Sequence, residues 1–451
     1  MTVLSVLLVG YAIGLILVGQ WVGRRVRETS DFFVAGRSLG TGLVFATFLA
    51  ANLGAGTTVG ATGQAYTDGL AAWWWDGSAG LGSLVLAFWI GPRIWREAHR
   101  LGLLTVGDFL EHHFGRGVRG LAAFIVWAGS FAILCAQLRG AGEVLERVVG
   151  LPLNAGAFLA AAGTVAYFVA GGLVSAARVN AIQVVIVLAG FSLAVPYAVG
   201  VAPSWSALAG DTSFWRGSGV GWQTLLLLGP AFFLSPGLVQ KGFAASNERT
   251  LRRGVALNGL VLMAFACFPV LFGLAARALH PDLARPEMAL PAIFATATPA
   301  AVGAFGLVAV LSAEVSTADA VLYMLATSGA RDFYKGFLRP DASDADVLRM
   351  ARLLAVTGGL IAFGLTFVFD SIIDALRFFY QLMTVTLFAP TLGGLFLPRA
   401  GRGGALAAML MGVATFATIT VVTGGAGYGW AEPHFLGLLA SAATYLILAV
   451  F

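Results

Sequence analysis

Charged residues, histidine and cysteine are scarce in this chain of 451 residues. Only 11% of the residues are charged, whereas about a quarter are charged in an ordinary soluble domain. Such a chain would expose more apolar surface than water tolerates, which excludes a soluble enzyme, a nucleic-acid-binding protein and a disordered protein. Cys135 and Cys267 each lie inside an apolar run and predict no disulfide framework. The five histidines lack metal-site spacing, and we find no catalytic nucleophile group, so we expect neither an enzyme nor a cofactor.

Hydrophobic residues make up 59% of the chain and gather in long runs. A helix needs roughly 20 apolar residues to cross a bilayer. The first run lacks a basic segment before it and an Ala-x-Ala cleavage site, so we interpret it as a retained span rather than a signal peptide. The sequence therefore predicts an all-α integral membrane protein with about 13 transmembrane helices. The predicted spans are 3–22, 41–63, 70–91, 120–138, 151–173, 181–202, 218–240, 254–276, 296–328, 351–369, 372–397, 403–423 and 434–451.

Lysine and arginine residues in the loops predict the orientation of the chain. Cytoplasmic loops carry an excess of these residues. One alternate set of loops holds only six of the 27 basic residues, and the opposite set holds the other 21. We therefore expect an N-terminus outside and a cytoplasmic C-terminus, in the plasma (inner) membrane. The six residues are Arg139, Arg147, Arg216, Arg277, Arg285 and Arg377.

Two of the predicted helices contain residues that interrupt a helix. The run 41–63 carries two glycines and several polar residues within 50–58, and the run 218–240 carries Gly229-Pro230 followed by Ser235-Pro236-Gly237. Proline removes a backbone donor and clashes with the preceding turn. Inside a membrane, such interruptions persist only where they line a cavity or pack against protein. Matched interruptions in two halves of a chain indicate a transporter site.

The two interruptions lie five predicted helices apart, which predicts an internal repeat. We expect a first five-helix repeat at 41–202 and a second at 218–397. Because each repeat has an odd number of helices, the second is inverted relative to the first. Residues 1–40 then form an extra N-terminal helix with a cytoplasmic loop, and residues 398–451 form two C-terminal helices. The alternative is that the glycines only let helices pack closely.

Polar residues inside the ninth predicted helix indicate an ion site. Ala313, Ser316 and Thr317 share one helical face because they are spaced i, i+3 and i+4. Hydroxyl oxygens suit a small hard cation, although they also bond to the preceding turn or join neighbouring helices. Asp319 and Glu314 lie in the same helix, and acids within a membrane mark functional sites.

Two further charged residues have alternative interpretations. Asp76 follows Trp73-Trp74-Trp75. The tryptophans are typical of the membrane interface, but an acid below an aromatic cluster also suits the ammonium or hydroxyl of a solute. Arg139 is either a ligand for a solute carboxylate or a side chain that reaches the outer interface.

Four segments, in this order, carry a resemblance to a known family. Together with the thirteen spans they resemble the sodium/solute symporter (SSS) family, which has the inverted-repeat fold of the LeuT type. The resemblance implies sodium-coupled import of a small polar organic solute by alternating access. The segments are Ser30 to Arg37; Gly171-Gly172-Leu173 with Asn180 and Gln183; Gly237 to Lys241 with Ala244-Ala245; and Ala313 to Asp319 with Arg331 to Lys335.

The family's positions also imply particular ligands in this chain. Its sodium site maps onto the main-chain carbonyls of Ala50, Leu53 and Ala313 and the hydroxyls of Ser316 and Thr317, which agrees with the spacing argument. The polar ligands of sugar-transporting members are not reproduced at 56–57, so we expect a solute other than a sugar. Family substrate positions map onto Asn52, Gly56, Thr57, Asp76, Ser235, Tyr380 and Gln381.

One departure from the family suggests a second cation site. Asn180 stands where many members carry an acid that helps to bind a second sodium. Asp319 lies three residues after Ser316. We hypothesise that Asp319 supplies the negative charge of a second cation site with Asn180 and Ser316. The alternatives are a protonatable coupling residue or a structural hydrogen bond.

Two other functions remain open from the sequence. One is a proton-coupled symporter of the same fold, in which Asp319, Glu314 or Asp76 carries the proton. The other is a transporter-like sensor that binds a solute and signals to a partner, although no attached signalling domain is expected. The expected partners are the solute, Na⁺ and the lipid bilayer, with no nucleic acid and no obligate protein partner.

Overall fold

The computed structural model describes residues 3–24, 26, 28–201, 213–215, 220–368 and 371–450. These residues are nearly all helical and contain no β-strand. Arg25, Arg27, Arg216 and the predicted span ends at 202, 218–219, 369 and 451 lie outside them. The helices are α1 (Val3–Gly23), α2 (Thr29–Val34), α3 (Thr41–Asn52), α4 (Ala61–Asp68), α5 (Trp73–Val85), α6 (Gly91–Leu101), α7 (Val106–Phe114), α8 (Arg116–Val149), α9 (Leu153–Val201), α10 (Val220–Leu234), α11 (Pro236–Gly242), α12 (Glu248–Phe265), α13 (Cys267–Leu279), α14 (Ala289–Thr296), α15 (Ala300–Thr327), α16 (Asp344–Leu365), α17 (Ile372–Phe396), α18 (Gly401–Thr423) and α19 (Pro433–Val450).

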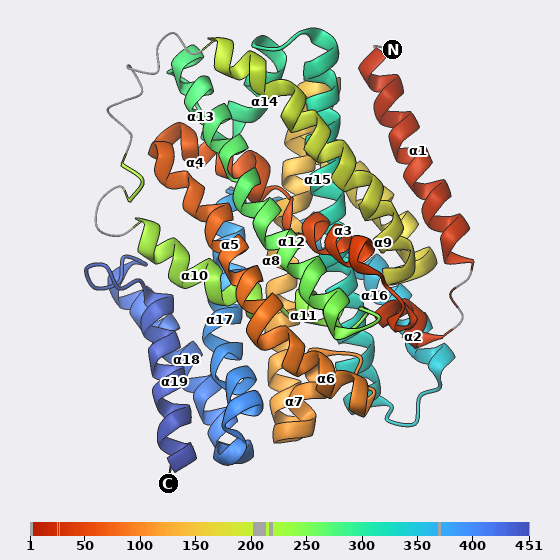
Figure 1. The fold of residues 1–451 in the computed structure, drawn as a ribbon, viewed down its shortest axis with the longest axis vertical. Helices are drawn as coiled ribbons and strands as arrows, with labels where there is room; N and C mark the ends of the chain where they lie inside the picture. The colour runs from red at the N-terminus through yellow and green to blue at the C-terminus, as the bar shows by residue number, and fades with distance from the viewer. Residues whose placement is uncertain are drawn as a thin grey trace.

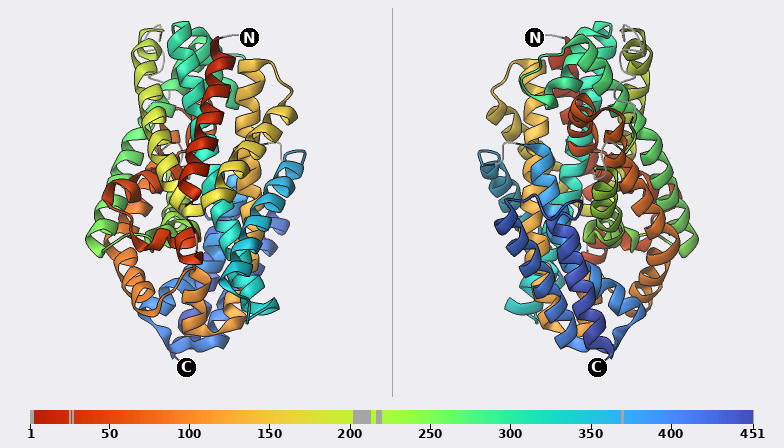
Figure 2. Two further views of the ribbon diagram at one scale, coloured as in Figure 1. Left: turned by 90° about the vertical axis from the view of Figure 1, so that its right-hand side faces the viewer. Right: turned by 90° about the vertical axis from the view of Figure 1, so that its left-hand side faces the viewer.

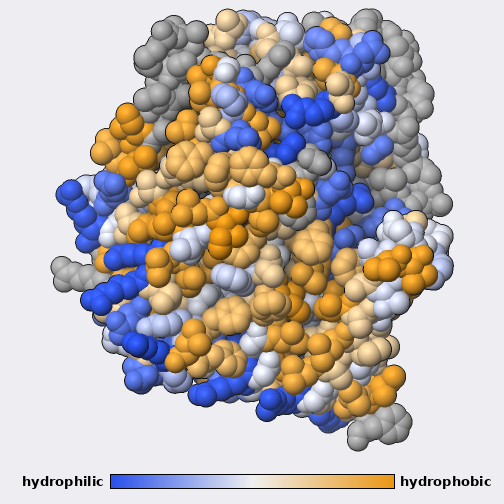
Figure 3. All heavy atoms as spheres, turned by 180° about the vertical axis from the view of Figure 1, so that it is seen from behind, coloured by the Kyte–Doolittle hydropathy of each residue, from blue (hydrophilic) through white to orange (hydrophobic). Residues whose placement is uncertain are grey.

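The long apolar helices show a multi-pass membrane protein. In the described part of the chain, eight helices are long and apolar enough to cross a bilayer, and two bent pairs raise the number to ten. Hydrophobic residues dominate the middle of the face in Figure 3, as expected of a surface that meets lipid. The fold class is confirmed, and the count of thirteen spans stays a prediction.

The predicted spans 151–173 and 181–202 both lie in α9, which is two helices joined at a kink at Gly172. The loop expected between them is wrong, because residues 174–180 are helical and Arg178 lies within a helix. The backbone departs from helical geometry only at Gly172, with φ 50° and ψ −137°. A side chain is strained there, and a Cβ atom would lie 2.6 Å from the Phe32 ring. One glycine therefore turns the chain without a loop.

Each bent pair has a chemically distinct break. The first bends by 63° between α3 and the stretch that begins at Gly56. The second bends by 41° at Ser235, and Pro236 begins α11 where its missing N–H costs nothing. The predicted interruption at Ser235-Pro236 is confirmed, whereas Pro230 lies inside a continuous α10. A transmembrane helix tolerates such a proline where neighbouring groups satisfy the freed carbonyl.

The helices α3, α10 and α11, which flank the two breaks, lie at mid-height among the longest helices (Figure 1). α3 contacts α15, α9 and α11, and α10 contacts α17. α1 packs along α9 on one flank, and the α18–α19 hairpin packs on α17 at the other. In both views of Figure 2, α1 begins at one end of the long axis and α19 finishes at the other. This arrangement places both breaks beside one central cavity.

Candidate ion and solute sites

Five oxygen atoms from α3 and α15 converge at the first break. The hydroxyl oxygen of Ser316 lies 3.0 Å from the carbonyl oxygen of Ala50 and 2.9 Å from that of Ala313. The hydroxyl oxygen of Thr317 lies 3.0 Å from each of the carbonyl oxygens of Ala50 and Leu53. All five residues are buried. The structure therefore brings together the complete set predicted from the sequence.

The break explains why these carbonyls are free. In an uninterrupted helix, the carbonyls of Ala50 and Leu53 would accept from the N–H groups of residues four positions later. Leu53 is extended instead, with φ −85° and ψ 92°. The resulting cluster of three carbonyls and two hydroxyls has only oxygen ligands and no formal charge. That chemistry suits a small, hard, monovalent cation.

The N–H groups after the break are satisfied by side chains. Thr57 Oγ1 accepts from the N–H of Gly54 at 2.8 Å, and Gln137 Oε1 accepts from the N–H of Ala55 at 2.8 Å. Such pairing is required because lipid offers no alternative partner. Gln137 comes from α8, and no spacing in the sequence connects it with the break.

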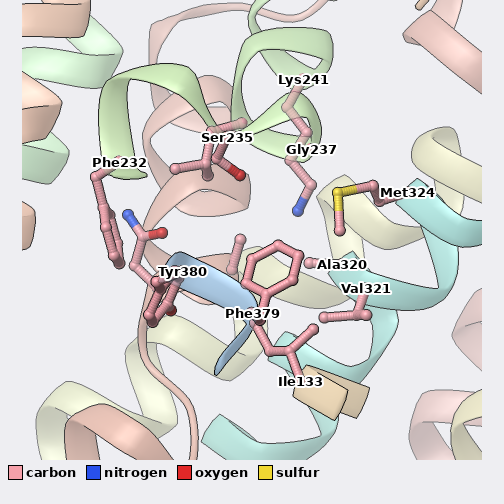
Figure 4. A pocket seen from close by; sticks show the side chains of 13 residues that line it. Ile133, Phe232, Ser235, Gly237, Lys241, Ala320, Val321, Met324, Phe379 and Tyr380 are labelled. Atoms are coloured by element: carbon pink, nitrogen blue, oxygen red, sulfur yellow. The ribbon is translucent and has the colours of Figure 1, made fainter. Parts of the chain in front are cut away.

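A cavity next to this cluster contains residues from both bent pairs (Figure 4). Among the predicted solute positions, Asn52, Ser235 and Tyr380 line it. The side-chain amide of Asn52 donates to Asn258 at 3.1 Å, and the amide of Asn258 donates to Ser83 at 3.1 Å. The lining residues are Ala51, Asn52, Ile133, Phe232, Ser235, Gly237, Leu238, Lys241, Ala320, Val321, Met324, Phe379 and Tyr380.

The structure does not bring the other predicted solute positions into this cavity as far as the described residues show. The hydroxyl of Thr57 is engaged with the main chain of Gly54 inside the break. Gly56 lies against α17, where a Cβ atom would lie 2.5 Å from Leu376. Gln381 is half-buried beside Tyr380 in the sequence but does not reach the lining.

Asp76 is buried close to the cavity wall. It acts electrostatically on Tyr380, and the ring of the preceding Trp75 lies 6.4 Å from the Tyr380 ring. Neither carboxylate oxygen of Asp76 has a hydrogen-bond partner in the described part of the chain. A buried polar group without a partner is costly, so Asp76 is available to a ligand that reaches past Tyr380.

Asp319 and Asn180 lie together in a second buried polar cluster. The side-chain amide of Asn180 interacts electrostatically with the Asp319 carboxyl group. The same amide donates a hydrogen bond to the hydroxyl of Thr47 at 3.4 Å. Considering the described residues alone, Asn180 Oδ1 and both Asp319 carboxylate oxygens have no hydrogen-bond partner. Ser316 lies three residues before Asp319 on α15. The predicted group is thus brought together with three acceptor atoms unused.

Sequence reasoning missed the burial of two basic residues that it had assigned to loops. Lys241 is 1% exposed and lines the cavity, and its ammonium donates to the carbonyl of Thr47 at 3.1 Å. Arg119 is 6% exposed and pairs with Asp108 at 3.0 Å and Asp332 at 2.9 Å. Counting charges by loop cannot detect burial, but the position of Lys241 directly after the run 218–240 was an available signal.

Two bent helices that line a central cavity, beside an oxygen cluster at one break, define a secondary transporter. The chain matches the family described as Sodium:solute symporter family over residues 32–208 and 205–412. It belongs to this family.

Similar proteins include "High-affinity choline transporter 1" of Caenorhabditis elegans, 26% identical over 90% of this chain and 76% of that protein. "High-affinity proline transporter PutP" of Bacillus subtilis is 25% identical over 89% of each chain. The "Sodium/glucose cotransporter" of Vibrio parahaemolyticus is 27% identical over 78% of this chain and 72% of that protein. The solutes in these names differ, so family membership does not select one.

Among solved structures, a Na⁺-coupled sialic acid symporter in a substrate-bound outward-open state has a TM-score of 0.86 at 17% identity. The match covers 100% of this chain and 98% of that one. Mhp1, a nucleobase-cation-symport-1 family transporter, has a TM-score of 0.66 at 15% identity over 93% of both chains. The family and the fold confirm a sodium-coupled symporter with a LeuT-type fold, whose coupling ion is Na⁺ and whose substrate is a small solute.

Proposed function

We propose that the five-oxygen cluster binds the coupling Na⁺ and that the adjacent cavity binds a small polar organic solute, which is imported by alternating access. The ligands of the ion are the carbonyls of Ala50, Leu53 and Ala313 and the hydroxyls of Ser316 and Thr317. The observation that carries the proposal is the convergence of these oxygens within 2.9–3.0 Å at a helix break beside the cavity.

The geometry supports a simple coupling between the ion and the solute. Na⁺ replaces the direct contacts between α3 and α15 and fixes the end of α3. Asn52 follows directly along α3 and faces the cavity. A solute that bonds to Asn52 therefore meets an ordered site when Na⁺ is bound, and each ligand strengthens the binding of the other.

The solute positions and the orientation are part of the proposal. Asn52, Ser235 and Tyr380 form the wall that meets the solute first. The other predicted solute positions lie behind that wall in this proposal: Gly56, Thr57, Asp76 and Gln381. The distribution of basic residues supports an outer N-terminus and a cytoplasmic C-terminus in the plasma (inner) membrane. The proposal includes no obligate protein partner.

The decisive experiment is Na⁺-dependent thermal stabilisation of the purified protein. A ligand that binds only the folded state stabilises it by about 2.7 kcal/mol at a hundred times its Kd. We expect Na⁺, but neither K⁺ nor choline, to stabilise the wild type, and the double variant Ser316→Ala/Thr317→Ala to lose this response. Thr327→Ala is the matched control, because in the described part of the chain the Thr327 hydroxyl bonds to carbonyls of α15 itself. The proposal is contradicted if Na⁺ does not stabilise the wild-type protein, or if Na⁺ still stabilises the double variant.

We also propose that Asp319 and Asn180, with Ser316, form a second cation site. The support is the three unused acceptor atoms in a buried cluster of described residues. Two bound Na⁺ ions double the slope of stabilisation against the logarithm of Na⁺ concentration. We expect Asp319→Asn to halve this slope and Asp341→Asn, on an exposed residue, to leave it unchanged. An unchanged slope with an altered pH dependence identifies a proton site, and no change in either identifies a structural hydrogen bond.

A further inference from the structure

Lys241 combines full burial with direct access to the solute cavity. Its side chain extends from the end of α11 and its ammonium points into the space beside Met324 (Figure 4). The structure gives this ammonium one hydrogen bond, to the carbonyl of Thr47 at 3.1 Å. An ammonium has three donors, so two of them are unused within the described residues.

The nearest compensating charge does not use these donors. Lys241 and Asp319 act on each other electrostatically, but no ion pair within 4.0 Å joins them among the described residues. Taking an ammonium out of water is expensive unless it is paired and hydrogen-bonded. Arg139, the basic residue first considered as a carboxylate ligand, lies 3.5 Å from Glu143. Among the described residues that line the cavity, Lys241 is the basic one.

The rest of the cavity wall is mixed in character. Ser235 contributes a hydroxyl to the same cavity as Lys241, whereas Phe232, Phe379 and Val321 contribute apolar surface. Tyr380 lies on the opposite side of the cavity from Lys241 in Figure 4. An anionic group at Lys241 would leave a compact, partly apolar body against the phenylalanine side chains.

We propose that Lys241 binds a carboxylate group of the transported solute, with Ser235 as a neighbouring donor. This inference rests on the proposed function, because it narrows the solute of the same cavity to a small carboxylate. A carboxylate takes the two unused donors and places a negative charge against a buried positive one, the strong form of hydrogen bond. The carboxylate also neutralises the positive charge of Lys241, which otherwise disfavours a cation at the neighbouring Asp319. A solute at Lys241 therefore strengthens cation binding at Asp319.

The experiment uses the full-length protein in lipid nanodiscs and measures thermal stabilisation in saturating Na⁺. The probes are matched pairs of acid and amide: L-proline and L-prolinamide, L-alanine and L-alaninamide, and lactate and lactamide. Glucose and choline are probes without a carboxylate. We expect at least one acid to raise the melting temperature above that in Na⁺ alone, while its amide does not. The proposal is overturned if glucose, choline or the amides stabilise the protein. It is also overturned if none of the acids does.

Variants of Lys241 test the assignment to this residue. We expect Lys241→Met to weaken binding of the responding acid about tenfold to a hundredfold, the range for a hydrogen bond to a charged group. Lys241→Arg keeps the charge and retains the response. Lys335→Met, which changes the only other lysine of the chain, has no effect. Equal affinity of wild type and Lys241→Met for the acid overturns the proposal.

Folding is controlled with a second variant. Lys241→Met leaves Asp319 buried without its nearby cation, so Lys241→Met/Asp319→Asn removes both charges together. This double variant is expected to keep stabilisation by Na⁺ at the five-oxygen cluster and to lose the response to the acid. If Na⁺ does not stabilise the wild-type protein, the proposed function is wrong. If Na⁺ stabilises it normally but the response to the acid does not depend on Lys241, only this inference is wrong.

Discussion

Gly54→Ala is expected to weaken Na⁺-dependent stabilisation of the protein at least tenfold. A Cβ atom at this position would lie 2.5 Å from the hydroxyl oxygen of Thr317 and 2.7 Å from its Cβ atom, and it would also meet Gln137 Oε1. No real Cβ contact is this short, so either Thr317 rotates away or α15 separates from the break. Both movements remove a proposed Na⁺ ligand, and overpacking alone costs about 1–3 kcal/mol.

The effect of Gly54→Ala is steric rather than conformational. Gly54 is not among the glycines with positive φ in the described chain, so alanine can adopt its backbone geometry. The measurement is the shift of melting temperature with Na⁺ concentration in the purified protein. We expect at least a tenfold higher Na⁺ concentration for half the wild-type shift. Gly42→Ala is the control on the same helix, because nothing lies within 4 Å of its Cβ position. A wild-type response in Gly54→Ala contradicts the close approach.

The proposed ion site was predictable in part because its two hydroxyl ligands follow from local sequence. Ser316 and Thr317 share a face through helical spacing, and the glycine-rich segment at 50–58 indicates where a helix frees its carbonyls. The resemblance to the sodium/solute symporter family supplied the pairing of the two segments. The structure then placed the hydroxyls within 3.0 Å of those carbonyls. Chemistry that depends on one break and one helical face is readable without coordinates.

The surroundings of the site were not predictable because they depend on contacts between distant segments. Gln137 satisfies the break from α8, 82 positions away, and Asn258 orients Asn52 from 206 positions away. Spacing within one helix carries no information about such pairs. Lys241 illustrates a second limit. A lysine at the end of a span reads as a cytoplasmic charge under the positive-inside rule, although tertiary packing buries it.

The unfolding free energy is expected to fall by about 3–5 kcal/mol in Arg119→Leu, because a buried ion-pair network loses the cation that joins Asp108 to Asp332. The guanidinium of Arg119 reaches Asp108 at 3.0 Å, Asp332 at 2.9 Å and the carbonyl of Arg331 at 2.8 Å, and it also pairs with Glu111. Leucine leaves Asp332 buried without this basic partner, while Asp108 keeps Arg331 at 3.3 Å. This network joins α7, α8 and the helical segment Ser328–Leu338 that continues α15, so its loss also loosens the helix that carries Ser316.

Thermal unfolding without Na⁺ separates this structural effect from ion binding. Arg116→Leu is the matched control on the same helix, because the Arg116 side chain is 67% exposed and an exposed ion pair contributes about 0–1 kcal/mol. Arg119→Lys restores the charge but not the fork of donors, so we expect an intermediate melting temperature. A melting temperature of Arg119→Leu equal to that of Arg116→Leu would contradict the network. It would mean that Asp108 and Asp332 find other partners, and that this network does not contribute to holding α15 in place.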